Sequence, residues 1–209
     1  MNLKQKSGKA ISQLRKIEKL TDKEMLLAAD WTEEWKVLTS TILSAQTKDE
    51  TTIKISHLLY KKYPTLNKLA KARLKDVKNI IKPINYHKTK SKNIIQTSRI
   101  LIKSYKGKIP HKIEKLLELP GVGRKTANVF LAVHNHPAIG VDTHVAFLSQ
   151  ILGWTKSSKK EKIEKDLELL FPKKYWISIN YILVRFGRIY KTRKKQVKKL
   201  IEERIIFRA

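Results

Sequence analysis

The chain has 209 residues, and its 46 lysine and arginine residues against 18 aspartate and glutamate residues give a formal net charge of +28. A charge of this size attracts polyanions, but it does not distinguish DNA from RNA or from an anionic membrane surface. With 41% hydrophobic residues the chain can fold around a core, and the lack of cysteine excludes disulfides, thiolate metal sites and a thiol nucleophile.

Apolar residues recur at helical spacing from one end of the chain to the other, and no segment alternates convincingly with a period of two. The six prolines fall at or beside the ends of the periodic segments, where helices commonly stop. The sequence therefore predicts an all-α fold. Helices are expected at residues 11–20, 37–44, 53–60, 74–81, 94–105, 129–133, 145–152, 163–171 and 177–189.

No segment reaches the roughly 18 uninterrupted apolar residues of a membrane-spanning helix. The first ten residues are polar and rich in lysine, and no apolar segment of the kind found in signal peptides follows them. We therefore expect a soluble, intracellular protein.

Residues 116–127 have the pattern of two helices joined by a tight turn. The first helix ends near Leu119, the turn has the sequence Pro-Gly-Val-Gly, and the second helix begins with Arg124. Glycines at 121 and 123 would let the backbone take dihedral angles closed to other residues, so that successive N–H groups point outward at the positive end of the second helix. Such a helix-hairpin-helix binds phosphate without reading base sequence, although a plain joint between two helices has a similar pattern.

Lys125 and Asp142 carry the groups that removal of a base from DNA requires. The reaction passes through an oxocarbenium-like transition state at the sugar C1′, so a site needs a nucleophile, a carboxylate and phosphate anchors. Burial beside the positive pole of its own helix and near Arg124 would favour the free amine of Lys125. The free amine attacks C1′ and forms a Schiff base, which makes the 2′ proton acidic and permits β-elimination 3′ to the lesion.

Each candidate residue also has a simpler interpretation. Asp142 precedes an expected helix and is suited to be its N-cap, and Lys125 could be one phosphate contact among many lysines. His134 and His136 have a spacing that suits neither one helix face nor a ligand set without cysteines or clustered carboxylates, so we expect a loop and no metal site. His144 is expected to be packed and hydrogen-bonded instead of acting as a base.

In these motifs the chain resembles the endonuclease III family of DNA base-excision glycosylases, which share a helix-hairpin-helix followed by a Gly/Pro-rich loop and an aspartate. The resemblance extends from about Trp35 to Tyr190 and includes the sequence LSAQTKD at residues 43–49 and the segment 88–105. It implies a bilobal helix-hairpin-helix DNA glycosylase fold.

The resemblance also implies how the lobes divide the chain, because the sequence itself holds no repeat and no low-complexity linker that would mark a boundary. A six-helix lobe with the helix-hairpin-helix is expected to span residues 24–136. Residues 1–23 and 137–209 are expected to form a second helical lobe from both termini.

The family further assigns roles to single residues. Its nucleophilic lysine corresponds to Lys125, and its aspartate corresponds to Asp142, which assists by activating the amine or by stabilising positive charge on the sugar. Gln46 falls at the glutamine that fills the space left by the flipped base, and Tyr86 falls where the family places an apolar or aromatic wedge. A helix C-cap for Gln46 and a buried core tyrosine for Tyr86 are the alternatives. The residues expected to contact DNA are Gln46, Tyr86, Leu119, Gly121, Val122, Gly123, Arg124, Thr143, His144, Lys191 and Arg193.

Most members of this family hold a four-iron cluster in a C-terminal loop with four cysteines, whereas this chain has no cysteine. Iron–sulfur ligation needs thiolates, so we expect no cluster and no other cofactor. Where that loop would begin, six of the nine residues 191–199 are basic, and apolar residues follow at helix-like spacing up to Phe207. They are expected to form a final amphipathic helix that packs inward and turns its lysines towards DNA, or else a solvated basic face without a specific partner.

The sequence therefore predicts a base-excision repair DNA glycosylase with AP lyase activity that removes oxidised pyrimidines from double-stranded DNA and acts at abasic sites. We expect a monomer without metal or cofactor, cytoplasmic in a prokaryote and associated with the nucleoid through its DNA binding. A uracil or thymine mismatch glycosylase of the same fold is an alternative that Lys125 disfavours, because such relatives commonly carry another residue there. The sequence also leaves open a non-catalytic helix-hairpin-helix DNA-binding protein and a basic RNA-binding protein, the latter disfavoured by the absence of aromatic stacking motifs.

Overall fold

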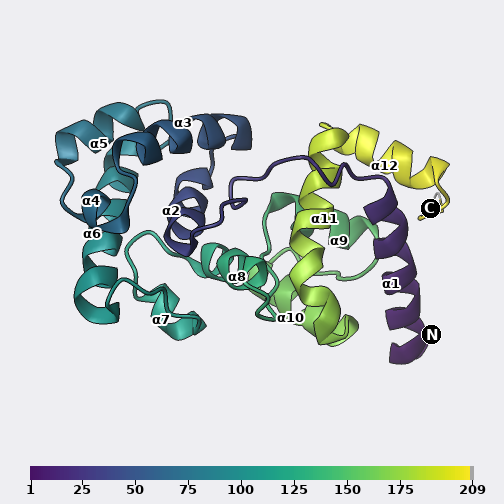
Figure 1. Ribbon diagram of the computed structural model, residues 1–209. Coiled ribbons are helices and arrows are strands. Elements are labelled where there is room, and N and C mark those ends of the chain that lie inside the picture. Colours follow the sequence, from purple (N-terminus) through teal and green to yellow (C-terminus); the bar gives the residue numbers. More distant parts are fainter. Residues whose placement is uncertain (208–209) are drawn as a thin grey trace. The chain divides into compact units, whose positions relative to one another are not determined.

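The computed structural model describes residues 1–207, and every regular element within them is a helix, as the sequence predicts (Figure 1). The chain divides into two compact units, of which Leu26–Val133 is one and Met1–Met25 with the chain from His134 onward is the other. The family resemblance implies boundaries after residues 23 and 136, whereas the two compact units divide after Met25 and after Val133, the last residue of α8. No helix in the described part of the chain is long and apolar enough to cross a membrane.

The unit formed by residues 26–133 is built around α2. Seven consecutive residues of this helix, 37–43, are buried, because α3, α6 and α8 pack around it. The hydroxyl of Thr41 donates to Val37 O at 2.7 Å, which lets a polar side chain lie in the core. The helices of this unit are α2 (Glu34–Ser44), α3 (Asp49–Lys62), α4 (Leu66–Ala70), α5 (Leu74–Ile80), α6 (His87–Tyr105), α7 (Ile113–Leu117) and α8 (Arg124–Val133). These are seven helices, whereas the family resemblance implies a lobe of six; the sequence pattern predicts no helix at α4, whose five residues are too few to show a period.

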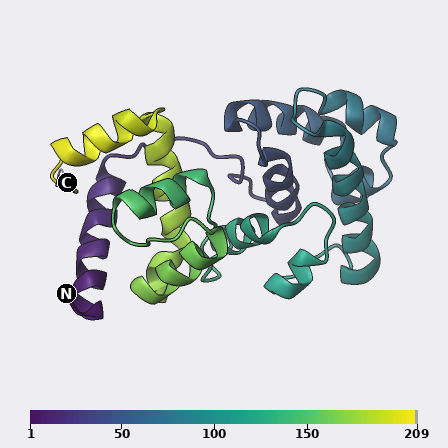
Figure 2. The ribbon, with the colours of Figure 1, turned by 180° about the vertical axis from the view of Figure 1, so that it is seen from behind.

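The other unit is built around α11, which packs against α1, α9 and α12 (Figures 1 and 2). The face of α11 that carries Ile179, Leu183 and Phe186 is fully buried. The helices of this unit are α1 (Leu3–Lys19), α9 (Thr143–Ile151), α10 (Lys160–Leu170), the 3₁₀ helix η1 (Lys173–Tyr175), α11 (Trp176–Ile189) and α12 (Arg193–Glu202). Elements from the beginning and the end of the chain thus share one core.

A buried glutamine joins three segments of this unit. Gln13 on α1 donates through Nε2 to Ile205 O at 3.1 Å, and its Oε1 accepts from Trp154 Nε1 at 2.8 Å. Ile205, which follows α12, is 4% exposed, whereas Phe207 is 79% exposed. The prediction of a final amphipathic helix is confirmed for α12, but the prediction that apolar residues pack inward as far as Phe207 is wrong, because the chain has left the helix and turned away from the core by then.

Candidate DNA-binding and catalytic site

The turn between α7 and α8 is held in place by α6. Thr97 of α6 donates through Oγ1 to Pro120 O at 2.8 Å. Gly121 has a φ of 83°, and a Cβ at this position would lie 2.9 Å from Asn93 Nδ2 and 3.1 Å from Ile42 Cγ2. Glycine is therefore required at position 121 both for its backbone conformation and for the close approach of α6 and α2.

Gly123 differs from Gly121. Its backbone is outside the left-handed region, and nothing lies within 4 Å of a Cβ built there. The carbonyl of Gly123 accepts from Ala127 N at 2.9 Å, so this residue leads directly into α8. The expectation that both glycines take dihedral angles closed to other residues is thus wrong for Gly123, whose conformation any residue can adopt in the free protein.

Two expected DNA contacts of the hairpin, Leu119 and Val122, are core residues. They are 2% and 6% exposed, and Val122 N donates to Leu119 O at 3.0 Å to close the turn. Their side chains fix the hairpin on the unit, and the backbone N–H groups of both residues donate within the hairpin and α7. Arg124, at the start of α8, is exposed.

Lys125 occupies the second position of α8 and is half-buried. The residues that follow it, Thr126 and Ala127, are buried and anchor the first turn of the helix in the core. This first turn contains no acidic residue, so no carboxylate of the helix itself offsets the positive pole beside Lys125.

Asp142 caps α9, as its position in the sequence predicts. Its Oδ1 accepts from Val145 N at 2.8 Å, and its backbone is extended, as is usual at an N-cap. Asp142 is partly buried, Thr143 is exposed, and His144 is half-buried. Lys125 and Asp142 belong to different units of the chain.

His144 is packed against α11, as predicted. A Cβ at Gly187 would lie 2.0 Å from His144 Nδ1, so the imidazole ring occupies the space that any other residue at position 187 would fill. Gly187 O also accepts from Gln196 Nε2 at 3.1 Å, which ties α12 to the same point on α11. These contacts identify His144 as a packing residue of its unit.

Gln46 and Tyr86 stand on two loops that hydrogen bonds join together. Both residues have a positive φ, of 56° and 58°, although neither is glycine. Asn85 donates through Nδ2 to Gln46 O and through its backbone N to Thr47 Oγ1, the latter at 3.2 Å. Gln46 follows the C-cap residue of α2, Ala45, and is exposed. Tyr86 is 65% exposed, so the alternative of a buried core tyrosine is wrong.

Beneath these loops lies Lys90 of α6, which is not among the site residues predicted from the sequence. Only 6% of the residue is exposed, and its Nζ donates to Leu43 O at 2.7 Å and to Ala45 O at 2.5 Å. Burial lowers the pKa of this lysine to about 8. The sequence carries only a weak signal for its burial: Lys90 lies four residues before Ile94, on the same face of the helix, but a lysine is usually exposed.

Lys191 and Arg193 are exposed at the start of α12. The guanidinium of Arg193 lies over the ring of Phe147 at 4.8 Å from its centroid, so Arg193 attaches α12 to α9 in addition to carrying charge. Thr192 caps the helix by accepting from Lys195 N at 3.3 Å.

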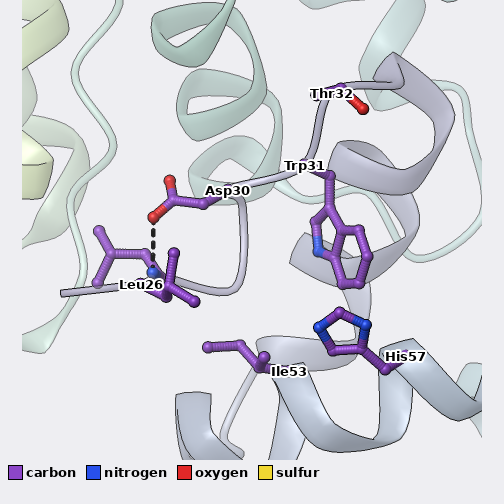
Figure 3. Close-up of a pocket in the computed structure, with 7 residues that line it drawn as sticks. Leu26, Asp30, Trp31, Thr32, Ile53 and His57 are labelled. Carbon is purple, nitrogen blue, oxygen red and sulfur yellow. Dashed lines mark hydrogen bonds between the residues drawn. The ribbon is translucent and has the colours of Figure 1, made fainter. Parts of the chain in front are cut away.

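A separate surface pocket of about 250 Å³ lies in the unit 26–133 (Figure 3). Trp31 forms one wall, and its ring lies 4.7 Å from that of His57. Asp30 shapes the pocket by accepting from Leu27 N at 2.7 Å. Neither the hairpin nor Lys125 contributes to its lining.

An all-helical fold with this hairpin defines a class of DNA repair proteins, and residues 39–173 match the HhH-GPD superfamily of base excision DNA repair proteins. Within this class, the chain belongs to the endonuclease III family, as the sequence predicts. It is 45% identical to endonuclease III of Thermotoga maritima over 158 residues, which cover 75% of this chain and 74% of that protein. The chain is accordingly a DNA glycosylase/AP lyase of base excision repair and binds DNA.

Two solved structures share its fold. The structure of a trapped endonuclease III–DNA covalent intermediate has a TM-score of 0.82 and 30% sequence identity, covering 92% of this chain and 89% of that one. The structure of a non-covalent endonuclease III–DNA complex has a TM-score of 0.83 and 27% identity, covering 97% and 99% of the two chains.

The residues of this chain do not fit the iron–sulfur cluster of the family. The chain has no cysteine, and residues 1–207 contain no group of three or more histidine and acidic side chains that would hold a metal. Asn135, between His134 and His136, has a φ of 60°, which is typical of a loop. The segment after Gly187 instead forms α12 and is attached by the contacts of Gln13, Arg193 and Gln196.

Proposed function

We propose that this protein excises oxidised pyrimidines from double-stranded DNA through a Schiff base formed by Lys125 and then cuts the strand by β-elimination. The observation that carries the proposal is the place of Lys125, half-buried on the first turn of α8 and directly after the hairpin. The free amine is the nucleophilic form of a lysine, and in this position it directly follows the segment proposed to hold the DNA backbone. A similar protein, endonuclease III, has been trapped as a covalent intermediate with DNA, which is the kind of species that an amine nucleophile gives.

In the proposed reaction the amine of Lys125 attacks C1′, and the bond from C1′ to the base breaks. The base leaves with the bonding electrons and takes up a proton, and the sugar ring opens to an iminium ion. Loss of a proton from C2′ then expels the 3′ phosphate and cuts the strand, and water hydrolyses the remaining imine to release the sugar and the free amine of Lys125. Asp142 assists the first step, either by accepting the proton of the amine or by facing the positive charge on the sugar. Its bond to Val145 N holds the carboxylate in one orientation for either task.

The hairpin is proposed to hold the DNA backbone through N–H groups. The first N–H groups of a helix have no acceptor within that helix, and they point towards its positive pole. The open space beside Gly123 leaves room for a phosphate to approach the backbone closely. Contacts of this kind bind DNA without reading its sequence.

The start of α12 is proposed to contact phosphates as well, in the part of the chain where the family carries its cluster. Because Arg193 also packs on Phe147, Lys191 and Lys194 provide the cleaner test. Replacing both with alanine should make the salt dependence of DNA binding shallower, by a slope of about 0.9 for each phosphate that is no longer neutralised. Replacing Lys4 and Lys9 of α1 with alanine is the control for net charge. If that variant changed the salt dependence of DNA binding equally, α12 would be a solvated basic face without a specific contact to DNA.

We further propose that the protein works as a monomer without a metal or cluster. The absence of cysteine supports the lack of a cluster, since an iron–sulfur cluster needs thiolates. Purified protein should then be colourless, contain no stoichiometric iron and keep its activity after dialysis against a chelator. Light scattering, with and without DNA, tests the monomer.

The lesion class is tested with matched duplexes carrying thymine glycol, dihydrouracil, uracil opposite guanine, or an abasic site. The proposal expects excision of the first two bases and cleavage at the abasic site. Excision of uracil alone, without strand cleavage, would instead support the mismatch glycosylase of the same fold. Binding without any product would favour a non-catalytic DNA-binding protein.

A further inference from the structure

Lys90 presents an unusual arrangement, a buried ammonium whose acceptors are all uncharged. Its Nζ reaches Leu43 O at 2.7 Å, Ala45 O at 2.5 Å and Thr47 Oγ1 at 3.4 Å. A lysine ammonium has three N–H donors, so these acceptors account for all of them. A buried charge of this kind costs stability unless its interactions offset its desolvation, which raises the question of what the lysine contributes.

Two of the acceptors belong to the end of α2, where carbonyl groups lack partners within the helix. A cation near a helix C-terminus is favourable, but α2 has no basic residue in its own last turn. Lys90, which comes from α6, supplies that charge across the unit. It thus fastens the end of α2 to the beginning of α6.

The segments fastened in this way are those that carry Gln46 and Tyr86. The left-handed conformation of each is unfavourable for a residue other than glycine and persists only where the surroundings hold it. Thr47 Oγ1 accepts from both Lys90 Nζ and Asn85 N, and Asn85 Nδ2 donates to Gln46 O. Lys90 is therefore part of the hydrogen-bond network that determines where Gln46 stands relative to Tyr86.

We propose that Lys90 is a positioning residue for base extrusion, whose buried ammonium holds the loop 45–47 so that Gln46 and Tyr86 meet the DNA already in place. The inference rests on the proposed function and on the role that the family resemblance implies for Gln46, which is to fill the space left by the flipped base. A side chain that must enter a duplex acts better when it is held in advance, because less ordering is then needed on binding.

A residue that only positions Gln46 and Tyr86 can be replaced with a loss of excision while the protein still folds and binds DNA. Replacing Lys90 by methionine removes a desolvated charge but leaves the carbonyl groups of Leu43 and Ala45 without their lysine donor, and these two effects on stability oppose each other. Lys90→Met should therefore remain folded at the temperature of the assay, which a thermal melt checks. It should bind undamaged duplex with the same affinity as the control Lys92→Met, which removes an exposed lysine from the same helix. Single-turnover excision of thymine glycol should nevertheless fall by about tenfold or more in Lys90→Met alone.

A double-mutant cycle with Gln46→Ala decides whether Lys90 acts through Gln46. If it does, Lys90→Met should slow excision much less in the Gln46→Ala background than in the wild-type background. A fluorescent base analogue opposite the lesion should report the same loss as slower base extrusion. If Lys90→Met lowered the excision rate by the same factor in both backgrounds, the proposal would be overturned. Excision at the wild-type rate by Lys90→Met would overturn it as well.

The outcomes also separate this proposal from the one on which it rests. Wild-type excision by Gln46→Ala would refute the role of Gln46 itself. Loss of excision in Gln46→Ala with none in Lys90→Met would refute only the role of Lys90. If Lys90→Met does not fold, Thr47→Val takes its place. This variant removes the hydroxyl that accepts from both Lys90 and Asn85, and it leaves the lysine in position. Unimpaired excision by folded Thr47→Val would count against the proposal.

Discussion

The carboxylate of Asp142 accepts a 2.8 Å hydrogen bond from Val145 N and so caps α9. A residue proposed to act in catalysis therefore also stabilises the helix that positions it. Asparagine caps a helix about as well as aspartate, but it carries no charge, so the two tasks can be separated by mutation.

Asp142→Asn should fold normally and lose turnover by about two to three orders of magnitude, the usual loss when one electrostatic group is removed from an active site. Asp142→Ala should lose turnover to a similar degree and also lose about 1 kcal/mol of stability with the cap. Thermal melts and single-turnover rates of the two variants test this. Near-normal turnover by folded Asp142→Asn would leave capping as the only task of this residue.

The two hairpin glycines should behave differently when each is replaced by alanine. Gly121→Ala should lower the free energy of unfolding by about 1–3 kcal/mol, because of its positive φ and the close approach of Asn93. Gly123→Ala should fold like the wild type and weaken binding to damaged and undamaged duplex alike, since the added methyl group obstructs only the approach of phosphate. Denaturant unfolding and filter binding measure the two effects. A Gly123→Ala variant that lost lesion preference but kept its affinity for undamaged DNA would contradict the proposed role of the hairpin.

Gln13 should be essential for the stability of the unit formed by both termini. Gln13→Leu leaves Trp154 Nε1 and Ile205 O without the partners they have now, at a cost of about 1–3 kcal/mol for each group. The neighbouring, exposed Ser12→Leu is the control and should change stability little. A melting temperature that was equal in both variants would show that the segment after α12 is held by other interactions.

The buried Lys90 should give the stability of the protein a recognisable pH dependence. Burial lowers its pKa to about 8, whereas an unfolded chain holds the proton up to a pH of about 10.4. Between these values the unfolded state binds more protons, so the free energy of unfolding rises with pH, by at most about 1.4 kcal/mol per pH unit. The wild type should therefore gain stability relative to Lys90→Met from pH 8 to pH 10. Denaturant unfolding at several pH values measures this. If the free energy of unfolding changed with pH equally in the wild type and in Lys90→Met, Lys90 would not be a buried ammonium.

Much of the fold and part of the site could be predicted from the sequence. Periodic apolar residues and prolines at helix ends indicate the long helices, and Asp142 is recognisable as a cap because N-capping depends on residues next to it in the chain. Local patterns do not reveal α4, whose five residues are too short to show a period. They also make Gly121 and Gly123 look alike, because the difference between them arises from the packing of α6 against the turn.

Other features depend on contacts between distant residues and leave little trace in the pattern. The burial of Lys90 is difficult to recognise among 46 basic residues, because a lysine is usually exposed. The left-handed backbone of Gln46 and Tyr86 is equally hidden, since neither residue favours it and the hydrogen bonds around Gln46 come from the distant residues Asn85 and Lys90.

The proposal that Lys125 is the nucleophile is tested most directly by borohydride trapping on a duplex with thymine glycol. Borohydride reduces a Schiff base to a stable amine and so joins protein to DNA covalently during turnover. We predict a trapped complex with the wild type and with Lys112→Ala, which removes an exposed lysine next to α7, and none with Lys125→Ala. An undiminished yield of trapped complex from folded Lys125→Ala would contradict the assignment of the nucleophile.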